Sequence, residues 1–242
     1  MITNNNFLII LCCVDPPEGA PVIRGLAQPD RNVLIYTDNR NHCLRKLETR
    51  SVRGARSWIS STLAGRCSKS GDVDGYKTLG RLHQPFECKH YQNFIFLTAN
   101  WFKIKKINLL NESLTTIHES PEQRQLRFLE LGTSPNEFYV TANHGVLHVM
   151  DGTETWLIES SSSMLNTDPN AIQFNKPMQI VWLNNDTLLV ADTQTHTLKK
   201  VDVNLKKAET ICNGMYALTV HTEKLSMFSN TSQTIYLKGV AT

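Results

Sequence analysis

Two segments far apart in the chain share one pattern, and this repeat restricts the fold more than any other feature. Residues 34–48 read LIYTDNRNHCLRKLE, and residues 188–202 read LLVADTQTHTLKKVD. The segments are identical at five matched positions, which pair Leu34 with Leu188, Asp38 with Asp192, His42 with His196, Leu44 with Leu198 and Lys46 with Lys200. Self-similarity over such a separation indicates a fold built from repeated units.

Three further segments follow the pattern more loosely. They read FIFLTANWFKIKKIN, EFYVTANHGVLHVMD and LSMFSNTSQTIYLKG, and they place Thr98, Thr141 and Ser229 at the position of Asp38. The resulting units are spaced irregularly around the roughly 40 to 50 residues of one propeller blade. Apolar and polar residues alternate within the units, which indicates strands, because helices would need apolar residues at a spacing of about 3.6.

The repeat therefore predicts an all-β fold, namely a β-propeller of four-stranded blades that occupies residues 1–242 as one domain. The five repeat units predict five blades, and a sixth blade would require a longer chain. The fifth unit ends after its third strand, so we expect the apolar segment at residues 7–14 to supply the missing outer strand and close the ring, which removes exposed edges. A signal peptide is the alternative for this segment. The predicted blades cover about residues 20–67, 84–120, 124–160, 173–214, and 215–240 together with 7–14.

The repeat resembles that of the NHL family of β-propellers, in which an Asp and a short polar turn precede an Asn-His-x-Ile-Arg-like sequence. TDNRNHCLRKLE and ADTQTHTLKKVD are similar to this motif, and TLAGRCSKSGDVDGYKTLGRLHQP is similar to the linker of extracellular members. The resemblance covers about residues 20–240 and implies a propeller, usually of six blades. Because members of the family include interaction modules, RNA-binding proteins and peptide-amidating lyases, the fold alone does not decide the function.

The recurring Asp and His residues are interpreted as structural parts of the blade. We expect the carboxylates of Asp38 and Asp192 to accept backbone N–H groups of the turn that follows. We expect the imidazoles of His42 and His196 to pack between blades and to bond a neighbouring carbonyl group. Catalytic use would require one copy to have different surroundings, and the sequence singles out neither copy.

Other candidate chemistry is equally sparse. His144 and His148 have the i, i+4 spacing of a metal site on a helix, but on a strand they are about 13 Å apart and cannot share an ion. GDVDG at residues 71–75 lacks the later ligands of an EF-hand calcium loop, so we interpret it as a turn between blades. We therefore predict no catalytic residues, no metal site and no cofactor, and a metal-dependent lyase remains the second alternative function.

Lysine clusters raise the first alternative function, which is an intracellular RNA-binding or substrate-adaptor propeller. The formal net charge is only +3, so the argument depends on clustering. Trp101 and Phe102 beside Lys103 would suit stacking on single-stranded RNA. The clustered residues are Lys103, Lys105, Lys106, Lys199, Lys200, Lys206 and Lys207.

The cysteines and glycosylation sequons favour an extracellular or secreted location over a cytoplasmic one. Cys43 lies on the third strand of the first unit and Cys67 beyond its fourth, so antiparallel pairing with a connection near residues 52–58 would allow a disulfide. Partners for Cys12, Cys13, Cys88 and Cys212 cannot be assigned. Asn-x-Ser/Thr sequons begin at Asn111, Asn185 and Asn230.

One face of the predicted propeller is the candidate binding surface, because the turns that join second and third strands all emerge on it. Trp101 is its most informative residue, since a large aromatic side chain at a turn is a common anchor in protein recognition. Loops 68–83 and 161–172 would border the face. The predicted binding residues are Arg40, Asn41, Asn100, Trp101, Asn143, His144, Gln194 and Thr195.

The sequence thus predicts a non-enzymatic interaction module that binds a protein partner or another macromolecule on this face. RNA is the less favoured partner. Membrane insertion is not expected, because no apolar run reaches the roughly 18 residues that would span a bilayer.

Overall fold

The computed structural model of the protein consists of consecutive antiparallel sheets. It describes residues 20–52, 55–134, 136–160, 173–214, 216–224 and 233–240. Within these ranges no helix is long and apolar enough to cross a membrane.

Four blades each contain four strands that pair in chain order, and the sheet of one blade has an additional short strand. Blade 1 contains β1 (Ile23–Asp30), β2 (Val33–Asp38), β3 (Cys43–Val52) and β4 (Ala55–Ala64). Blade 2 contains β6 (Cys88–Tyr91), β7 (Phe94–Ala99), β8 (Lys103–Asn108) and β9 (Ser113–Glu119). Blade 3 contains β10 (Leu129–Leu131), β11 (Glu137–Ala142), β12 (Gly145–Met150) and β13 (Thr153–Glu159). Blade 4 contains β14 (Pro177–Asn184), β15 (Thr187–Asp192), β16 (Thr197–Asp202) and β17 (Lys207–Cys212).

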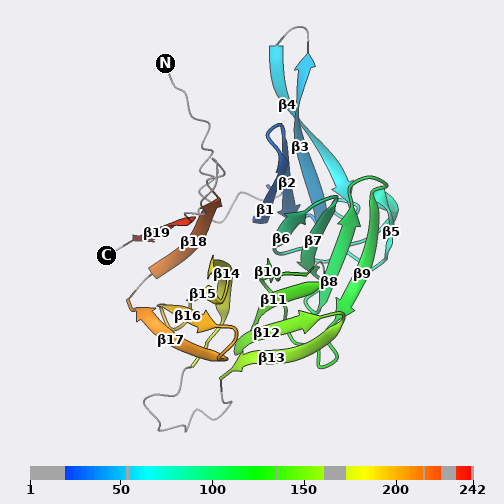
Figure 1. Cartoon of the computed structure of the whole chain (residues 1–242). Helices are drawn as coiled ribbons and strands as arrows, with labels where there is room; N and C mark the ends of the chain where they lie inside the picture. Colours follow the sequence, from blue (N-terminus) through cyan, green and yellow to red (C-terminus); the bar gives the residue numbers. More distant parts are fainter. Residues whose placement is uncertain are drawn as a thin grey trace.

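Two smaller elements complete the sheets. The short strand β5 (Gly75–Tyr76) adds to the outer edge of blade 2 beside β9, and the 3₁₀ turn η1 (Lys77–Leu79) follows it. The last sheet pairs β18 (Tyr216–Lys224) with β19 (Gln233–Val240). Neighbouring sheets contact one another through their first strands, in the order β1, β6, β10, β14 and β18 (Figure 1). This arrangement of radial four-stranded sheets confirms the predicted β-propeller.

The core consists of separate apolar layers between neighbouring blades. Strand alternation explains this division, because successive side chains of one strand point to opposite faces of its sheet. In β7, Ile95 and Leu97 pack against residues of blade 1, whereas Phe96 packs against Phe138 and other residues of blade 3. Both faces of an inner blade are therefore apolar, which accounts for the near-continuous apolar runs of β7 and β11.

The structure corrects the predicted alignment of the repeat by one residue. Thr98 and Thr141 are the fifth residues of their six-residue strands, and the equivalent residue of β2 is Thr37 rather than Asp38. All three Thr residues are fully buried. The turns that follow differ in length, because four residues separate β2 from β3, three separate β7 from β8, and two separate β11 from β12. Sequence matching across turns of unequal length produced the shift.

The last sheet also differs from the prediction. β18 pairs directly with β19, so the TIYLKG segment is the neighbour of the first strand and not a third strand. The predicted strand between them, including Ser229, falls outside the described residues, as does the predicted closing strand at residues 7–14.

Strands β3 and β4 continue beyond the rest of blade 1 as a two-stranded ribbon (Figure 1). β2 pairs with β3 only as far as Glu48, and Thr49 then pairs with Trp58 alone. Trp58 therefore lies within β4, and the predicted connection over residues 52–58 is wrong in length.

Candidate functional site

The predicted binding residues occupy equivalent turns in the four blades. These turns join the second and third strands, and in blades 1, 2 and 3 the turn is hydrogen-bonded to the segment that enters the next blade. Asn39 Nδ2 donates to the carbonyl of Pro85, Trp101 accepts from the N–H of Leu126, and Asn143 accepts from the N–H of Lys176. The turns hold Arg40 and Asn41, Asn100 and Trp101, Asn143 and His144, and Gln194 and Thr195.

An aromatic cluster lies where the first two of these turns meet the segment between blades 1 and 2. The rings of His42 and His83 are stacked, with centroids 5.2 Å apart, and the Trp101 ring lies 6.3 Å from that of His83. His83 Nδ1 is 2.7 Å from Ser70 Oγ. The cluster therefore joins two predicted binding turns through His83, a residue that the sequence did not single out because its partners lie in another blade.

His42 is held in one chemical form by its surroundings. Its Nδ1 accepts the backbone N–H of Gln84 at 3.1 Å, which requires a lone pair on that nitrogen and leaves the proton on Nε2. Burial lowers the pKa of His42, the neighbouring His83 lowers it further, and Asp38 acts in the opposite direction. The partner of His42 Nδ1 is thus a backbone N–H group that donates to it, and not the neighbouring carbonyl that was expected.

The recurring His residues share a backbone conformation. The φ angles of His42 and His196 are 60° and 53°, and both residues stand directly before the third strand of a blade. His belongs with Asn and Asp among the non-glycine residues that most often adopt this left-handed region. The recurrence is therefore explained by turn geometry, as the structural interpretation expected.

Trp101 lies in a turn whose backbone is strained and whose position is fixed by hydrogen bonds of Asn100. Its φ is 66° and that of Asn100 is 57°, and left-handed conformation is rare for a bulky side chain. Asn100 fixes the base, because its Oδ1 accepts the N–H of His83 and its Nδ2 donates to the carbonyl of Gly71. Trp101 is 37% exposed to solvent. A rigid turn thus presents a partly exposed indole ring beside two imidazoles.

The two recurring carboxylates act differently. Asp38 accepts from the backbone N–H and the side-chain amide of Asn41, which is the predicted turn contact. Asp192 accepts from the Thr195 hydroxyl of its own turn, but it also accepts the N–H of Asn175 and lies 2.6 Å from the ammonium group of Lys199. Both members of this ion pair are buried. These contacts of Asp38 are therefore confined to the turn that follows it, whereas those of Asp192 extend beyond its turn.

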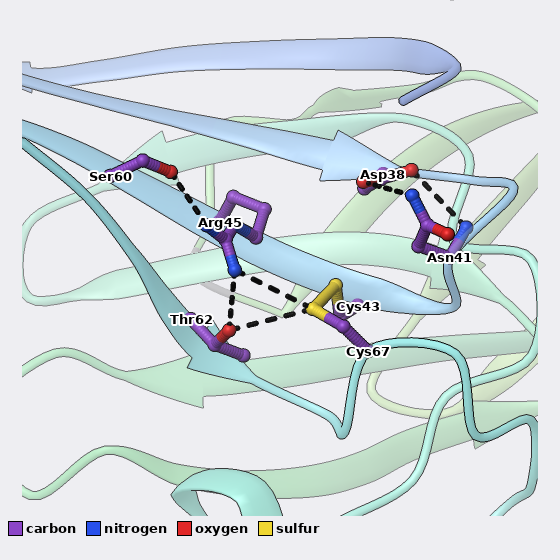
Figure 2. Close-up of a disulfide and its surroundings, with 7 residues drawn as sticks. All are labelled: Asp38, Asn41, Cys43, Arg45, Ser60, Thr62 and Cys67. Carbon is purple, nitrogen blue, oxygen red and sulfur yellow. Dashed lines mark hydrogen bonds between the residues drawn. A yellow bond between two sulfur atoms is a disulfide. The ribbon is translucent and has the colours of Figure 1, made fainter. Parts of the chain in front are cut away.

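The predicted disulfide between Cys43 and Cys67 is present, and Figure 2 shows its surroundings. Arg45 lies beside it, with one guanidinium nitrogen 2.8 Å from Thr62 Oγ1 and the other 2.8 Å from Ser60 Oγ. The N–H of Ser68 donates to the carbonyl of Asn41, one turn away. The disulfide thus anchors the start of the loop that carries Ser70 and His83 to the turn after β2.

The GDVDG segment and the lysines of blade 2 form one ionic cluster. Asp72 accepts from Lys103 at 2.6 Å and from Lys105 at 2.8 Å, and Asp74 lies 2.8 Å from Lys105. Lys105 is fully buried. The segment does carry the chain between blades, as predicted, and its carboxylates neutralise two of the seven lysines that suggested RNA binding.

The two His residues of blade 3 have separate surroundings. His148 Nε2 lies 2.9 Å from Glu137, and its ring stacks on Tyr139 with centroids 4.8 Å apart. His144 is exposed in the turn before β12. Within the described part of the chain, no group of three or more His, Cys, Asp or Glu side chains is placed to hold a metal ion.

A shallow cleft of about 340 Å³ lies between blades 2 and 3, at the turns opposite the predicted face. His118 borders it, and both of its ring nitrogens face oxygen acceptors, the carbonyl of Gly152 at 3.2 Å and the carboxylate of Glu154 at 2.9 Å. Glu154 also pairs with Arg124 at 2.5 Å. The sequence carries no sign of this cluster, because its members come from different blades at irregular spacing.

Two sequons are accessible for glycosylation. Asn111 and Asn185 are exposed, and they lie in the β8–β9 and β14–β15 turns, on the side opposite the predicted face. Asn230 lies outside the described residues. The free cysteines among the described residues are Cys88, which is buried, and Cys212, which is partly exposed.

Comparison with known proteins gives a likeness of fold. No protein-family model matches the sequence, and no curated protein matches it. Virginiamycin B lyase from Staphylococcus aureus is 14% identical with a TM-score of 0.52, and the match covers 81% of this chain and 57% of that one. A streptogramin B lyase is 13% identical with a TM-score of 0.49, covering 78% of this chain and 53% of that one. The nidogen/laminin complex is 13% identical with a TM-score of 0.45, covering 79% and 80%.

The shared feature is the fold. At these identities a likeness does not extend to chemistry. The chain also spans little more than half the length of the two lyases.

Proposed function

We propose that the chain is a non-enzymatic, NHL-type interaction module that binds a protein partner on the face carrying the second-to-third-strand turns. The observation that carries the proposal is Trp101, a partly exposed indole held at a left-handed φ of 66°. Such strain persists where the surroundings impose it, and it concentrates at binding sites. Large aromatic residues on a rigid base are the usual anchors of protein interfaces.

The cluster around Trp101 also has the composition of an interface. Two imidazoles and one indole provide flat apolar surface with polar edges, which suits contact with a protein better than with water. Exposed Arg40 lies in the neighbouring turn. The proposed binding surface therefore consists of the cluster of His42, His83 and Trp101, together with the turn residues predicted from the sequence.

An extracellular location is part of the proposal. The disulfide between Cys43 and Cys67 supports it, because disulfides persist in oxidising compartments. The exposed sequons at Asn111 and Asn185 are compatible with it, and glycans there would leave the proposed face clear. The cytosolic RNA-binding alternative is weakened, since Lys103, Lys105 and Lys199 are engaged by carboxylates.

Affinity capture with matched tryptophan variants tests the proposal. The immobilised full chain, Trp101→Ala and Trp58→Ala are each exposed to extracellular protein from the source organism, and the retained proteins are quantified by mass spectrometry. Trp58 is the control, because it is 43% exposed on the ribbon, away from the proposed face. We expect a protein retained by the wild type and by Trp58→Ala, with at least tenfold less retained by Trp101→Ala, since anchor truncation commonly costs about 2 kcal/mol or more.

Equal retention by all three chains would show that Trp101 is not the anchor. Retention of RNA instead of protein, falling steeply with salt, would favour the alternative.

A further inference from the structure

A chain of hydrogen bonds connects the first strands of blades 1, 2 and 3 at their starting ends. The N–H of Gly25 donates to Thr37 Oγ1 at 2.8 Å, and that hydroxyl donates to the carbonyl of Phe86 at 2.7 Å. The N–H of Phe86 donates to the carbonyl of Thr98, and Thr98 Oγ1 donates to the carbonyl of Arg127. The backbones beside Arg24 and at Arg127 are therefore fixed on either side of Phe86.

Close packing of blades 1 and 2 reinforces this arrangement. A Cβ atom at Gly25 would lie 2.5 Å from the backbone nitrogen of Cys88 and 2.8 Å from Glu87 Cα, so only glycine allows β1 to approach this closely. As a result, the Arg24 guanidinium lies over the Phe86 ring, with Cζ 5.4 Å from its centroid. Phe128 meets the same ring edge-on at 5.1 Å. The close packing of β1 at Gly25 and the contact with Phe86 thus determine the position of the Arg24 side chain.

Arg127 brings a second guanidinium that lacks a counter-charge. Its Nη2 donates to Gln125 Oε1 at 3.0 Å, but its Nε is buried and has no hydrogen-bond partner within the described chain. Among the described residues, neither Arg24 nor Arg127 forms a salt bridge. Burial lowers the pKa of Arg127, and the charge of Arg24 lowers it further, so the two cations lie close enough to repel each other. Uncompensated buried donors and like charges are costly unless a ligand satisfies them.

We propose that Arg24 and Arg127 form a carboxylate-binding site at the mouth of the propeller, with the Arg24 guanidinium over the Phe86 ring. Guanidinium groups match the two oxygens of a carboxylate with paired N–H donors. The aromatic rings beside Arg24 are those of Phe86 and Phe128, which offer no donors for the additional oxygens of a phosphate.

The site opens on the same side as Trp101. Arg24 follows Ile23, which pairs with Asp38 at the end of β2, and the N–H of Arg127 donates to Thr141 near the end of β11. The ends of β2 and β11 both lead into turns that join a second to a third strand. An acidic side chain of a partner bound at Trp101 could supply the carboxylate, and so could a free small acid; the arginine pair itself does not depend on the proposed partner.

Side-chain NMR of the full chain tests the site directly. The ¹H–¹⁵N signal of Arg127 Nε is assigned by its loss in Arg127→Lys and followed during titration with sodium succinate at constant ionic strength. We expect a saturable shift in the wild type and in Arg56→Gln, an exposed arginine of β4 that serves as the control. Arg24→Gln should bind succinate at least about tenfold more weakly, because it removes one charge-assisted contact and leaves the exposed position otherwise intact.

Two further titrations identify the source of the carboxylate. A capped Ala-Glu-Ala peptide that competes with succinate, while its Ala-Gln-Ala analogue does not, assigns the site to acidic side chains. Binding of succinate but not of the peptide assigns it to free acids. Either result supports the arginine pair, and neither depends on the capture experiment with Trp101→Ala.

No saturable shift, equal affinity in Arg24→Gln, or tighter binding of inorganic phosphate than of succinate would overturn the proposal. A failure of protein capture with an intact succinate titration would count against the partner function alone.

Discussion

The ammonium group of Lys105 lies 2.8 Å from a carboxylate oxygen of Asp74, although Lys105 has no exposed surface. The same ammonium lies 2.8 Å from Asp72. Asp74 also accepts the backbone N–H of Thr116 at 2.7 Å, so it bridges β8 and β9. The loop between blades 1 and 2 is thereby attached to the outer strands of blade 2.

Removing both carboxylates should destabilise the fold strongly. We expect the double variant Asp72→Asn, Asp74→Asn to lose about 3 kcal/mol of unfolding free energy, because a buried lysine is left without a counter-charge. Urea denaturation measures the change. Adding Lys105→Met should recover most of the loss, whereas Lys207→Met, at an exposed position of β17, should recover none. An unchanged midpoint in the double variant would contradict the assigned role.

The disulfide should contribute to stability through the loop it closes. Cys43 and Cys67 are 24 residues apart, for which the loop-entropy estimate is about 3 kcal/mol. We expect Cys43→Ala, Cys67→Ala to lower the unfolding free energy by about this amount in urea. Peptide mapping after alkylation without reduction should label Cys212 but leave buried Cys88 unlabelled. Labelled Cys43 in the native protein would refute the link.

Glu137 should stabilise the protein only while it is ionised. Burial alone would raise the pKa of Glu137, but hydrogen bonds from His148, Thr133 and Tyr139 outweigh burial and lower the pKa to about 2. A carboxyl group with a depressed folded-state pKa contributes stability above its ordinary pKa of 4.5 and loses it as the pH falls towards 2. Glu137→Gln should therefore be about 2 kcal/mol less stable than the wild type at pH 7, and the difference should shrink between pH 4.5 and pH 2. A difference independent of pH would mean that the charge is not involved.

Glu87 should have the opposite effect. Burial raises its pKa to about 7, against the opposing influence of Lys89. Because the folded state then holds a proton that the unfolded state releases above pH 4.5, the wild type should lose stability as the pH rises from 4.5 to about 7. Glu87→Gln keeps the acceptor for the Cys88 N–H and should be about 3 kcal/mol more stable than the wild type at pH 8, with no difference at pH 4. Chemical denaturation across this range decides the matter, and a variant that is less stable at pH 8 would disprove the expectation.

Several parts of the structure were predictable because they depend on local patterns. Alternation along a strand determines which residues face a neighbouring sheet, so the strands of blade 4 and the disulfide between Cys43 and Cys67 followed from the sequence. The recurrence of His42 and His196 indicated a structural role, and the left-handed φ angles of the two residues account for it. The one-residue error at Thr98 and Thr141 arose where turns of different length interrupt the period of two.

The candidate site depended instead on contacts between blades. His83 meets His42 and Trp101 through packing of one blade on the next, and Arg24 meets Phe86 only because Gly25 lets two strands approach. No spacing in the chain encodes such contacts, since they depend on the angle and distance between sheets. The sequence by itself thus determined the strands, their repeat and the propeller, because these follow from residue periodicity. Only the tertiary structure decided which charged and aromatic side chains meet, because those distances are set by how the blades pack around the ring.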